Sequence, residues 1–242
     1  MIAAIRSAFF AIHFLLASLA GLAIGICRPF NPDNSRLCGR LYAWGAKWLL
    51  GMQIEADRRV LDAIPPGAVF VSNHQSNFDL FILGAIVPDR TVSMGKKSLR
   101  WIPLFGQLYW LAGNVLVDRG NAFKARNTLQ DAVRTLRDKR TSIWIFPEGT
   151  RNSRTTLAPF KKGAFQMAIA AGVPVIPVCI SPYRQALRWG SWRPVPICVR
   201  VLPPIDTSGL TKKDTADLAL ECQRQMQNCF EGFVGRSPRA RS

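Results

Sequence analysis

One histidine and one aspartate stand five residues apart in the segment Asn73–Asp79, and together they could transfer a proton. A carboxylate bonded to one nitrogen of an imidazole fixes the tautomer and stabilises the imidazolium that forms when the other nitrogen takes a proton. On one continuous helix, His74 and Asp79 would lie about 140° apart around the axis. They can meet only if His74 lies in a turn and Asp79 in the first helical turn behind it. Ser76 as an N-cap would permit this, with Asp79 at the third helical position.

A purely structural role for the same segment is also open. Ser76-x-x-Asp79 has the spacing of a capping box, in which both side chains satisfy backbone N–H groups at the start of a helix. His74 would then only precede that helix. The other histidine of the chain, His13, lies inside an apolar segment, so His74 is the candidate for a general base.

A second group of residues indicates anion binding. The sequence FPEGTR at Phe146–Arg151 follows a very apolar segment, and α/β folds place their sites at the carboxyl ends of strands. Arg151 could bind a phosphate through two parallel hydrogen bonds, and Gly149 would let the backbone approach closely. Alternatively, Glu148 and Arg151 form a local ion pair that stabilises a loop. Further basic residues in this part of the chain are Lys96, Lys97, Arg100 and Arg119.

Three other classes of site are disfavoured. Residues 95–98 (GKKS) end like a phosphate-binding P-loop, but Arg90 stands where that motif requires glycine and Lys97 where it requires serine or threonine. No G-x-S-x-G sequence occurs, which argues against a serine hydrolase of the α/β type. The six cysteines contain no C-x-x-C pair, so we expect no metal site and reduced, packed cysteines in a protein that faces the cytosol.

The elements that must position these residues begin at about residue 67, where short β-branched segments alternate with longer helical ones. The candidate strands are Ala68–Ser72, Thr91–Met94, Val115–Val117, Ser142–Phe146, Val173–Ile180 and Ile197–Leu202. The candidate helices are Asn77–Ile86, Ala122–Asp138, Phe160–Ala171 and Lys213–Phe233. This alternation predicts an α/β domain whose mainly parallel, mixed sheet is flanked by helices. The prolines at positions 174, 177, 194, 196, 203 and 204 predict that the last strands are irregular or at an edge.

The N-terminus is apolar enough to meet a membrane. Residues 7–27 carry no formal charge, and as a helix they would reach roughly 30 Å, the thickness of the hydrocarbon core. We expect a retained anchor; a signal peptide cleaved near residues 17–20 is the alternative. Residues 35–51 combine aromatic and basic side chains, which suits a helix in the headgroup region or an ordinary amphipathic helix packed on the body.

The predicted organisation therefore has three parts. Residues 1–52 form a membrane-associated helical hairpin, which either spans the bilayer or dips into one leaflet. Residues 53–233 form the α/β domain, and residues 234–242 form a basic, disordered tail.

The strong positive charge limits the possible partners to anionic ones but does not distinguish among the classes of anionic partner. The 242 residues include 32 Lys and Arg against 15 Asp and Glu, a net charge of +17. Such a surface attracts nucleic acid, acidic lipid headgroups, phosphorylated substrates or an acidic carrier protein. A non-enzymatic protein that binds nucleic acid or anionic membrane would explain this charge. It would not explain a histidine–aspartate pair beside an arginine loop in an apolar body.

Four blocks of the sequence, in this order and spacing, resemble the glycerolipid acyltransferase family, which includes the lysophosphatidic acid acyltransferases. They are N-H-x-x-x-x-D at Asn73–Asp79, G-x-x-x-x-D-R at Gly113–Arg119, F-P-E-G-T-R at Phe146–Arg151 and V-P-V-I-P-V at Val173–Val178. The resemblance covers roughly residues 45–205. The second block carries residues 114–117 (NVLV) where the family often has aromatic side chains, which leaves the identity of the acceptor open.

The resemblance implies roles for individual residues. His74 would be the general base and Asp79 its orienting partner. The acceptor's phosphate site would contain Arg119, Glu148, Gly149, Thr150 and Arg151, to which we add Lys96 and Lys97. The strand Val173–Val178 would support the site or an acyl channel.

The implied reaction moves a fatty acyl group from acyl-CoA or acyl carrier protein to the free hydroxyl of lysophosphatidic acid, giving phosphatidic acid. Another lysolipid, such as lyso-ornithine lipid, is the alternative acceptor. We expect no cofactor besides the thioester co-substrate, because a thioester is already activated. The expected partners are membrane lipids, the acyl donor and the lysophospholipid, without nucleic acid. The expected location is the bacterial inner membrane, with the catalytic domain on its cytoplasmic face.

Overall fold

The computed structural model describes residues 2–118, 120, 122–154 and 156–234, and within them one mixed sheet forms the centre of the molecule. Its strands are β1 (Met52–Ala56), β2 (Val69–Ser72), β3 (Thr91–Lys96), β4 (Val115–Val117), β5 (Ser142–Ile145), β6 (Val175–Ile180) and β7 (Val195–Val201). Their order across the sheet is β1-β7-β6-β2-β5-β3-β4. All neighbours are parallel except β6 and β7, so the predicted fold class is confirmed.

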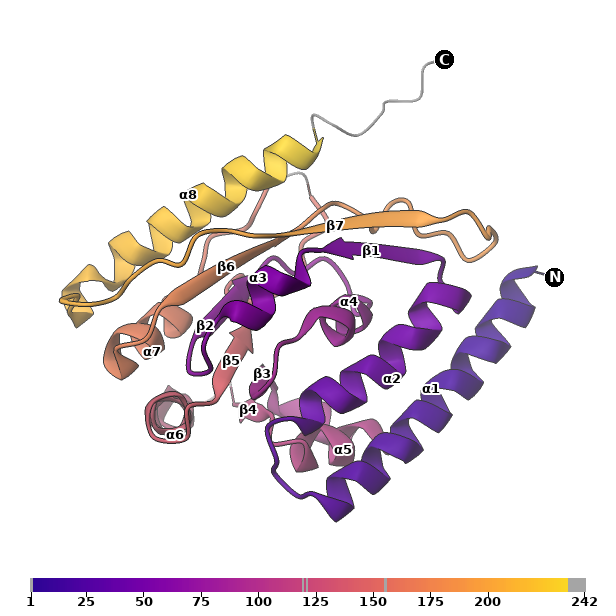
Figure 1. Ribbon diagram of the computed structural model, residues 1–242, viewed down its shortest axis with the longest axis horizontal. Coiled ribbons are helices and arrows are strands. Elements are labelled where there is room, and N and C mark those ends of the chain that lie inside the picture. Colours follow the sequence, from indigo (N-terminus) through magenta and orange to yellow (C-terminus); the bar gives the residue numbers. More distant parts are fainter. Residues whose placement is uncertain (1, 119, 121, 155, 235–242) are drawn as a thin grey trace.

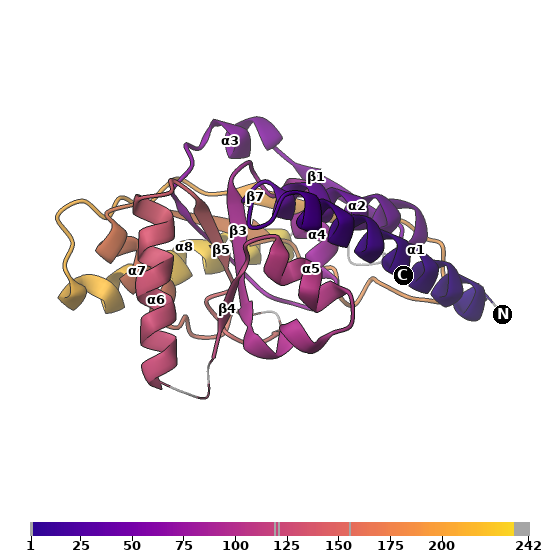
Figure 2. The same cartoon turned by 90° about the horizontal axis from the view of Figure 1, so that it is seen from below.

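Helices cover both faces of this sheet (Figures 1 and 2). On one face lie α1 (Ile2–Cys27), α2 (Asn34–Leu49), α4 (Asp79–Ile86) and α5 (Phe105–Leu111). On the other lie α6 (Ala122–Arg137), α7 (Gly163–Ala171) and α8 (Thr215–Val234). The shorter elements are α3 (Arg58–Ala63) and two 3₁₀ turns, η1 (Lys97–Trp101) and η2 (Lys212–Asp214).

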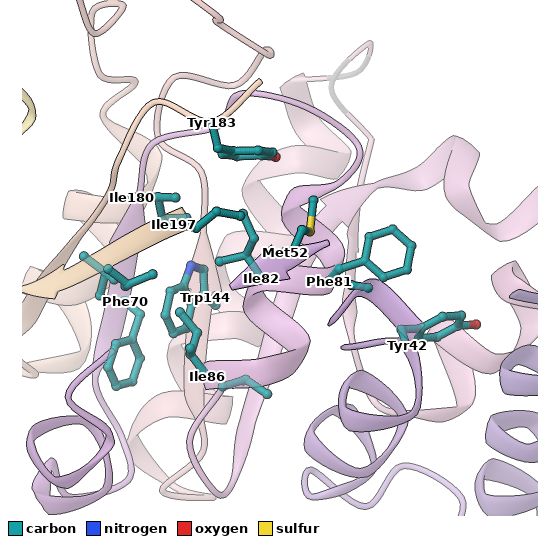
Figure 3. Packing of buried hydrophobic residues seen from close by; sticks show 14 of the residues in the cluster. Tyr42, Met52, Phe70, Phe81, Ile82, Ile86, Trp144, Ile180, Tyr183 and Ile197 are labelled. Carbon is teal, nitrogen blue, oxygen red and sulfur yellow. The ribbon is translucent and has the colours of Figure 1, made fainter. Parts of the chain in front are cut away.

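Alternation along the strands divides the apolar side chains between two cores, one on each face. Val69 and Val71 of β2 face α6, α7 and α8, whereas Phe70 between them faces the side of α2 and α4. The Phe70 ring stacks on the Trp144 ring with centroids 5.1 Å apart. Figure 3 shows this second core, in which Ile82 and Ile86 of α4 lie over the two rings.

The two N-terminal helices pack side by side and then against the α/β body. The Ser18 hydroxyl of α1 lies 2.9 Å from the Tyr42 hydroxyl of α2, and both residues are buried. Between α2 and α4 the backbones meet at two glycines, since a Cβ built on Gly39 would lie 2.7 Å from the Gly84 Cα. Because only glycine permits this approach, the N-terminal pair rests directly on the helix that begins with Asp79.

Most predicted elements are confirmed with shifted ends, and the ones that were not predicted are short. All six predicted strands and all four predicted helices of the body are present. The elements that were not predicted include β1, whose five residues pair at the sheet edge with β7, and the helices α3 and α5. A segment of five to seven residues shows too few repeats of a period to be recognised.

The prolines predicted last strands that are either irregular or at an edge of the sheet. The strands are irregular. Pro177 lies in β6, which is an interior strand, so the edge placement is wrong for β6 and for β7. The regular β6–β7 ladder starts at Val178↔Val201, and Val175 forms an isolated bridge with Ile205. On the β7 side of the strand, Pro177 falls between these two pairings, so no regular ladder on that side requires its missing N–H.

The predicted division of the chain can be placed on these elements. The boundary after residue 52 falls at the start of β1. Of the predicted tail, residues 235–242 lie outside the described residues.

Candidate active site

The topology collects the predicted motifs at one edge of the sheet. Strands β2 to β6 all run in the same direction, so their carboxyl ends share this edge. The His74 segment follows β2, and the Phe146–Arg151 loop follows its neighbour β5. Lys96 ends β3, which is two strands away from β2, or roughly 10 Å at normal strand spacing.

His74 and Asp79 form the predicted pair. The His74 Nδ1 lies 2.6 Å from the Asp79 Oδ2, with His74 in the turn after β2 and Asp79 at the first position of α4. A carboxylate oxygen accepts, so we assign the proton of the neutral imidazole to Nδ1, which leaves Nε2 with a free lone pair. The His74 side chain is 22% exposed and Asp79 is 1% exposed, so the imidazole is accessible from solvent while its carboxylate partner is shielded.

The prediction that Ser76 is the N-cap is wrong in detail, because α4 begins at Asp79 itself and its capping position is Phe78. The Ser76 hydroxyl accepts from the Phe78 N–H at 2.9 Å, within the turn before the helix. The Asp79 Oδ2 accepts from the N–H groups of Gln75 and Ser76, at 2.7 and 3.0 Å. One carboxylate therefore both orders the turn and holds the imidazole.

The second oxygen of Asp79 has a partner that the sequence did not indicate. The hydroxyl of Tyr183, a buried residue just beyond β6, donates to the Asp79 Oδ1. Burial, and then the neighbouring Asp79 carboxylate, raises the pKa of Tyr183 above its usual value. The hydroxyl therefore stays protonated and donates.

The loop after β5 fixes the position of His74. The rings of His74 and Phe146 stack with centroids 4.0 Å apart and an angle of 18° between their planes. The His74 N–H donates to the Glu148 Oε1 at 2.9 Å, and the His74 carbonyl accepts from the Asn152 N–H at 2.6 Å. Both main-chain groups of His74 and one face of its ring are thus held by a single loop.

Glu148 supports the site from inside the protein. It is 2% exposed, and its Oε2 accepts from the Asn152 side chain and the Ala158 N–H, each at 2.9 Å. Both carboxylate oxygens therefore have donors from the protein. Among the described residues the alternative of a local ion pair with Arg151 does not form, since the exposed Arg151 donates to the Asn77 Oδ1 at 3.0 Å.

The remaining predicted anion-binding residues lie around this loop. Gly149 has φ +69° and turns the chain, and Thr150 beside it is exposed. Lys96 is exposed at the end of β3, and the Lys97 ammonium lies 3.2 Å from a carboxylate oxygen of Asp118. That hydrogen bond lowers the pKa of Asp118 below its usual range. Arg119, the last of the predicted residues, lies outside the described residues.

A further lysine lies on the loop and was not predicted. The Cε and Nζ of Lys161 would lie 2.7 Å from a Cβ built on Gly149, so the lysine side chain crosses the glycine turn. The Lys161 N–H also donates to the Pro147 carbonyl at 2.8 Å. The sequence feature that could have indicated this lysine is the pair of lysines at positions 161 and 162, which follows the FPEGTR block after a short loop.

Comparison with known proteins identifies the family. Residues 58–181 match the protein family described as Acyltransferase. The 1-acyl-sn-glycerol-3-phosphate acyltransferase of Escherichia coli is 42% identical over 217 residues, which cover 89% of this chain and 88% of that protein. The enzyme of the same name from Haemophilus influenzae is 40% identical, with 88% of each chain covered. The chain belongs to the acyltransferase family. It is an enzyme that transfers acyl groups.

Two further comparisons extend this assignment. The mouse 1-acyl-sn-glycerol-3-phosphate acyltransferase alpha is 38% identical over 219 residues, which cover 88% of this acyltransferase and 76% of the mouse protein. The crystal structure of the 1-acyl-sn-glycerophosphate (LPA) acyltransferase PlsC from Thermotoga maritima superposes with a TM-score of 0.70. The superposition covers 97% of this chain and 99% of the PlsC chain. Because the two sequences are only 21% identical, the comparison shows that the fold is shared.

The contacts of Glu148 generate a test of its supporting role. Glu148→Gln replaces one acceptor by an NH₂ group, which must face either the His74 N–H or the donors of Asn152 and Ala158. Since hydrogen bonds to a charged group contribute about 1.5–3 kcal/mol each, we expect kcat/KM to fall by about tenfold or more. The melting temperature should fall too. The matched control is Glu231→Gln, an exposed glutamate of α8. A Glu148→Gln enzyme with wild-type kcat/KM well below its melting temperature would contradict this role.

Proposed function

We propose that this acyltransferase moves a fatty acyl group from a thioester to the free hydroxyl of lysophosphatidic acid, giving phosphatidic acid. The observation that carries the proposal is the His74–Asp79 pair beside a basic loop, bonded at 2.6 Å with the His74 side chain 22% exposed to solvent. The names of the relatives contain the same acceptor, 1-acyl-sn-glycerol 3-phosphate.

In the proposed mechanism, His74 acts directly as a general base. Its Nε2 takes the proton of the acceptor hydroxyl while the oxygen forms a bond to the thioester carbonyl carbon. The Asp79 carboxylate stabilises the imidazolium that results. The tetrahedral intermediate then collapses, the carbon–sulfur bond breaks, and the leaving thiolate takes the proton from Nε2. The products are the new ester and a free thiol, and His74 returns to its neutral form.

The oxyanion of the intermediate needs donors that the protein has not already used. The N–H groups of His74, Gln75 and Ser76 donate to the carboxylates of Glu148 and Asp79. We therefore assign the oxyanion to the cationic side of the β5 loop rather than to these amides.

We assign the acceptor's phosphate to the same loop. Arg151 is exposed there, and the Lys161 side chain crosses the turn at Gly149. A phosphate monoester carries close to two negative charges near neutral pH, which suits two cations on one loop. Lys96 and Lys97 at the end of β3 stand farther away, and Lys97 is paired with Asp118. They are better placed for the phosphates of an acyl-CoA or the acidic surface of an acyl carrier protein.

The N-terminal helices would hold this site at a membrane surface. Helix α1 is long and apolar enough to cross a membrane: its most apolar 18 residues have a mean hydropathy of 2.2, and 22% of them are buried. Its exposed side chains include Phe9, Ile12 and Leu16, which lie on one face. Because its opposite face packs on α2 and α5, we propose that α1 is retained and dips into one leaflet.

The first prediction of this proposal concerns the base. His74→Ala should lower transfer to lysophosphatidate by about 10²–10⁴ or more, because loss of a general base typically costs that much. The control is His13→Gln, which changes the other histidine and should keep activity. The assay follows free thiol and lipid product with purified protein, lysophosphatidate and oleoyl-CoA. More than a tenth of wild-type turnover in His74→Ala would exclude His74 as the base.

The acceptor is tested with the same preparation. Equal amounts of lysophosphatidate, lysophosphatidylethanolamine and lyso-ornithine lipid should yield phosphatidate as the main product. If a different lysolipid is preferred, lysophosphatidate is the wrong acceptor, whereas the assignment of the protein as an acyltransferase is unaffected.

Arg151→Ala should weaken use of the phosphorylated acceptor more than use of the donor. A lost charge-assisted hydrogen bond of roughly 1.5–3 kcal/mol corresponds to a ten- to hundredfold fall in kcat/KM. The matched control is Arg137→Ala, an exposed arginine of α6 at the opposite edge of the sheet. A loss that falls on the acyl donor alone would show that this loop does not bind the acceptor's phosphate.

Membrane attachment is tested on the exposed face of α1. Phe9, Ile12 and Leu16 are 54–59% exposed, so serine at all three positions should leave the fold intact. Each large apolar side chain buried in lipid contributes roughly 1.5–3 kcal/mol, so we expect the variant to move largely into the soluble fraction. Any remaining binding to anionic vesicles should be sensitive to salt. The control is Leu220→Ser on α8, and equal behaviour of the two variants would contradict the proposal.

A further inference from the structure

We propose that Tyr183 is a positioning residue of the acyl-transfer site, which acts through Asp79 and sets how strongly His74 holds its proton. This inference rests on the proposed role of His74 as the base. It adds a third residue to the His74–Asp79 pair. It also links β6, after which Tyr183 lies, to the proton transfer at His74.

The geometry places Tyr183 and His74 on opposite oxygens of one carboxylate. The Tyr183 hydroxyl donates to the Asp79 Oδ1, and the His74 Nδ1 bonds to the Asp79 Oδ2. Tyr183 and Asp79 are each 1% exposed, so no solvent molecule competes for the hydroxyl. Figure 3 shows the Tyr183 ring beyond Ile180, at the end of the apolar core.

Two side chains of the His74 segment hold Tyr183 in register. The Gln75 Oε1 accepts from the Tyr183 N–H at 3.2 Å, and the Gln75 Nε2 donates to the Ser181 carbonyl at 2.9 Å. Asn73 exchanges two hydrogen bonds with the main chain of Ile180, at 2.8 and 2.9 Å. Since these contacts fix the backbone from Ile180 to Tyr183, the tertiary structure holds the Tyr183 hydroxyl against Asp79.

The far end of the same segment is tied to the N-terminal helix. The buried Arg6 of α1 donates to the carbonyl of Arg188 at 2.8 Å and also to the carbonyl of Ser191. Its guanidinium lies over the rings of Trp189 and Trp192, at 5.9 and 4.9 Å from their centroids. The segment that carries Tyr183 is therefore held by the catalytic turn at one end and by α1 at the other.

The hydroxyl has a defined electrostatic effect. A donor on Oδ1 withdraws charge from the carboxylate, so Asp79 attracts the imidazolium of His74 less strongly than it would alone. Other charged groups near these residues are Glu148, which binds the His74 N–H, and Arg184, which lies near Tyr183. Neither occupies the position of the hydroxyl, so removal of the hydroxyl should make His74 more basic.

The test is Tyr183→Phe in the full chain, reconstituted in lipid vesicles. We expect the acidic limb of the kcat/KM profile to move to higher pH by about half to one pH unit, the equivalent of part of one hydrogen bond to a charged group. We also expect kcat to fall several-fold while KM for both substrates changes little. The matched control is Tyr42→Phe, which removes an equally buried hydroxyl bonded to Ser18.

A second measurement does not depend on substrate or turnover. The chain has two histidines, so in a His13→Gln background the imidazole signal of His74 can be titrated directly by NMR. Tyr183→Phe should raise the titration midpoint of His74. Incorporation of 3-fluorotyrosine, whose hydroxyl is a stronger donor, should lower it without removing any packed atom. This arm remains informative if Tyr183→Phe fails to fold.

The outcomes separate this inference from the proposed function. If the wild-type chain does not acylate lysophosphatidate, the proposed acceptor is wrong, and the NMR titration still tests Tyr183. If the pH profile and the titration midpoint of Tyr183→Phe match those of wild type, or if Tyr42→Phe shifts them equally, Tyr183 does not act through Asp79.

Discussion

The buried carboxylate of Asp79 is the constraint on which the site depends. A carboxylate 1% exposed to solvent remains charged only if donors replace the lost water. Here the donors are the His74 ring, the N–H groups of Gln75 and Ser76, and the Tyr183 hydroxyl. They come from the turn after β2 and from the segment after β6. The requirement to satisfy one charge therefore brings together a helix start, the His74 imidazole and a distant strand.

The turn after β2 and the loop after β5 hold different parts of His74. The carboxylate of Asp79 fixes the His74 ring, whereas the β5 loop fixes its backbone through Glu148 and Asn152. Because Glu148 is used inside the protein, the exposed part of this loop is cationic and can face an anion. Two buried acids thus order the site, and Arg151 and Lys161 give its open side a positive charge.

How far the sequence predicts the structure depends on the range of the interaction. The period and composition of β2, β5 and β6 are local properties, so these strands were found within two residues of their ends. The edge strand β1 carries only a short pattern, and its partner β7 is more than a hundred residues away. The edge placement predicted from Pro177 is wrong for the same reason. Whether an N–H is needed at this position depends on the distant segment at the end of β7 and beyond it.

By itself the sequence determined the class of fold, the apolar N-terminus and the pairing of His74 with Asp79, since each follows from residue types at short spacing. Only the tertiary structure decided that Glu148 supports the site from within, that Lys161 crosses the Gly149 turn, and that Tyr183 completes the environment of Asp79. The physical reason is that these contacts join residues about 10 to more than 100 positions apart. Their meeting is set by the order and direction of the strands, which no local pattern records.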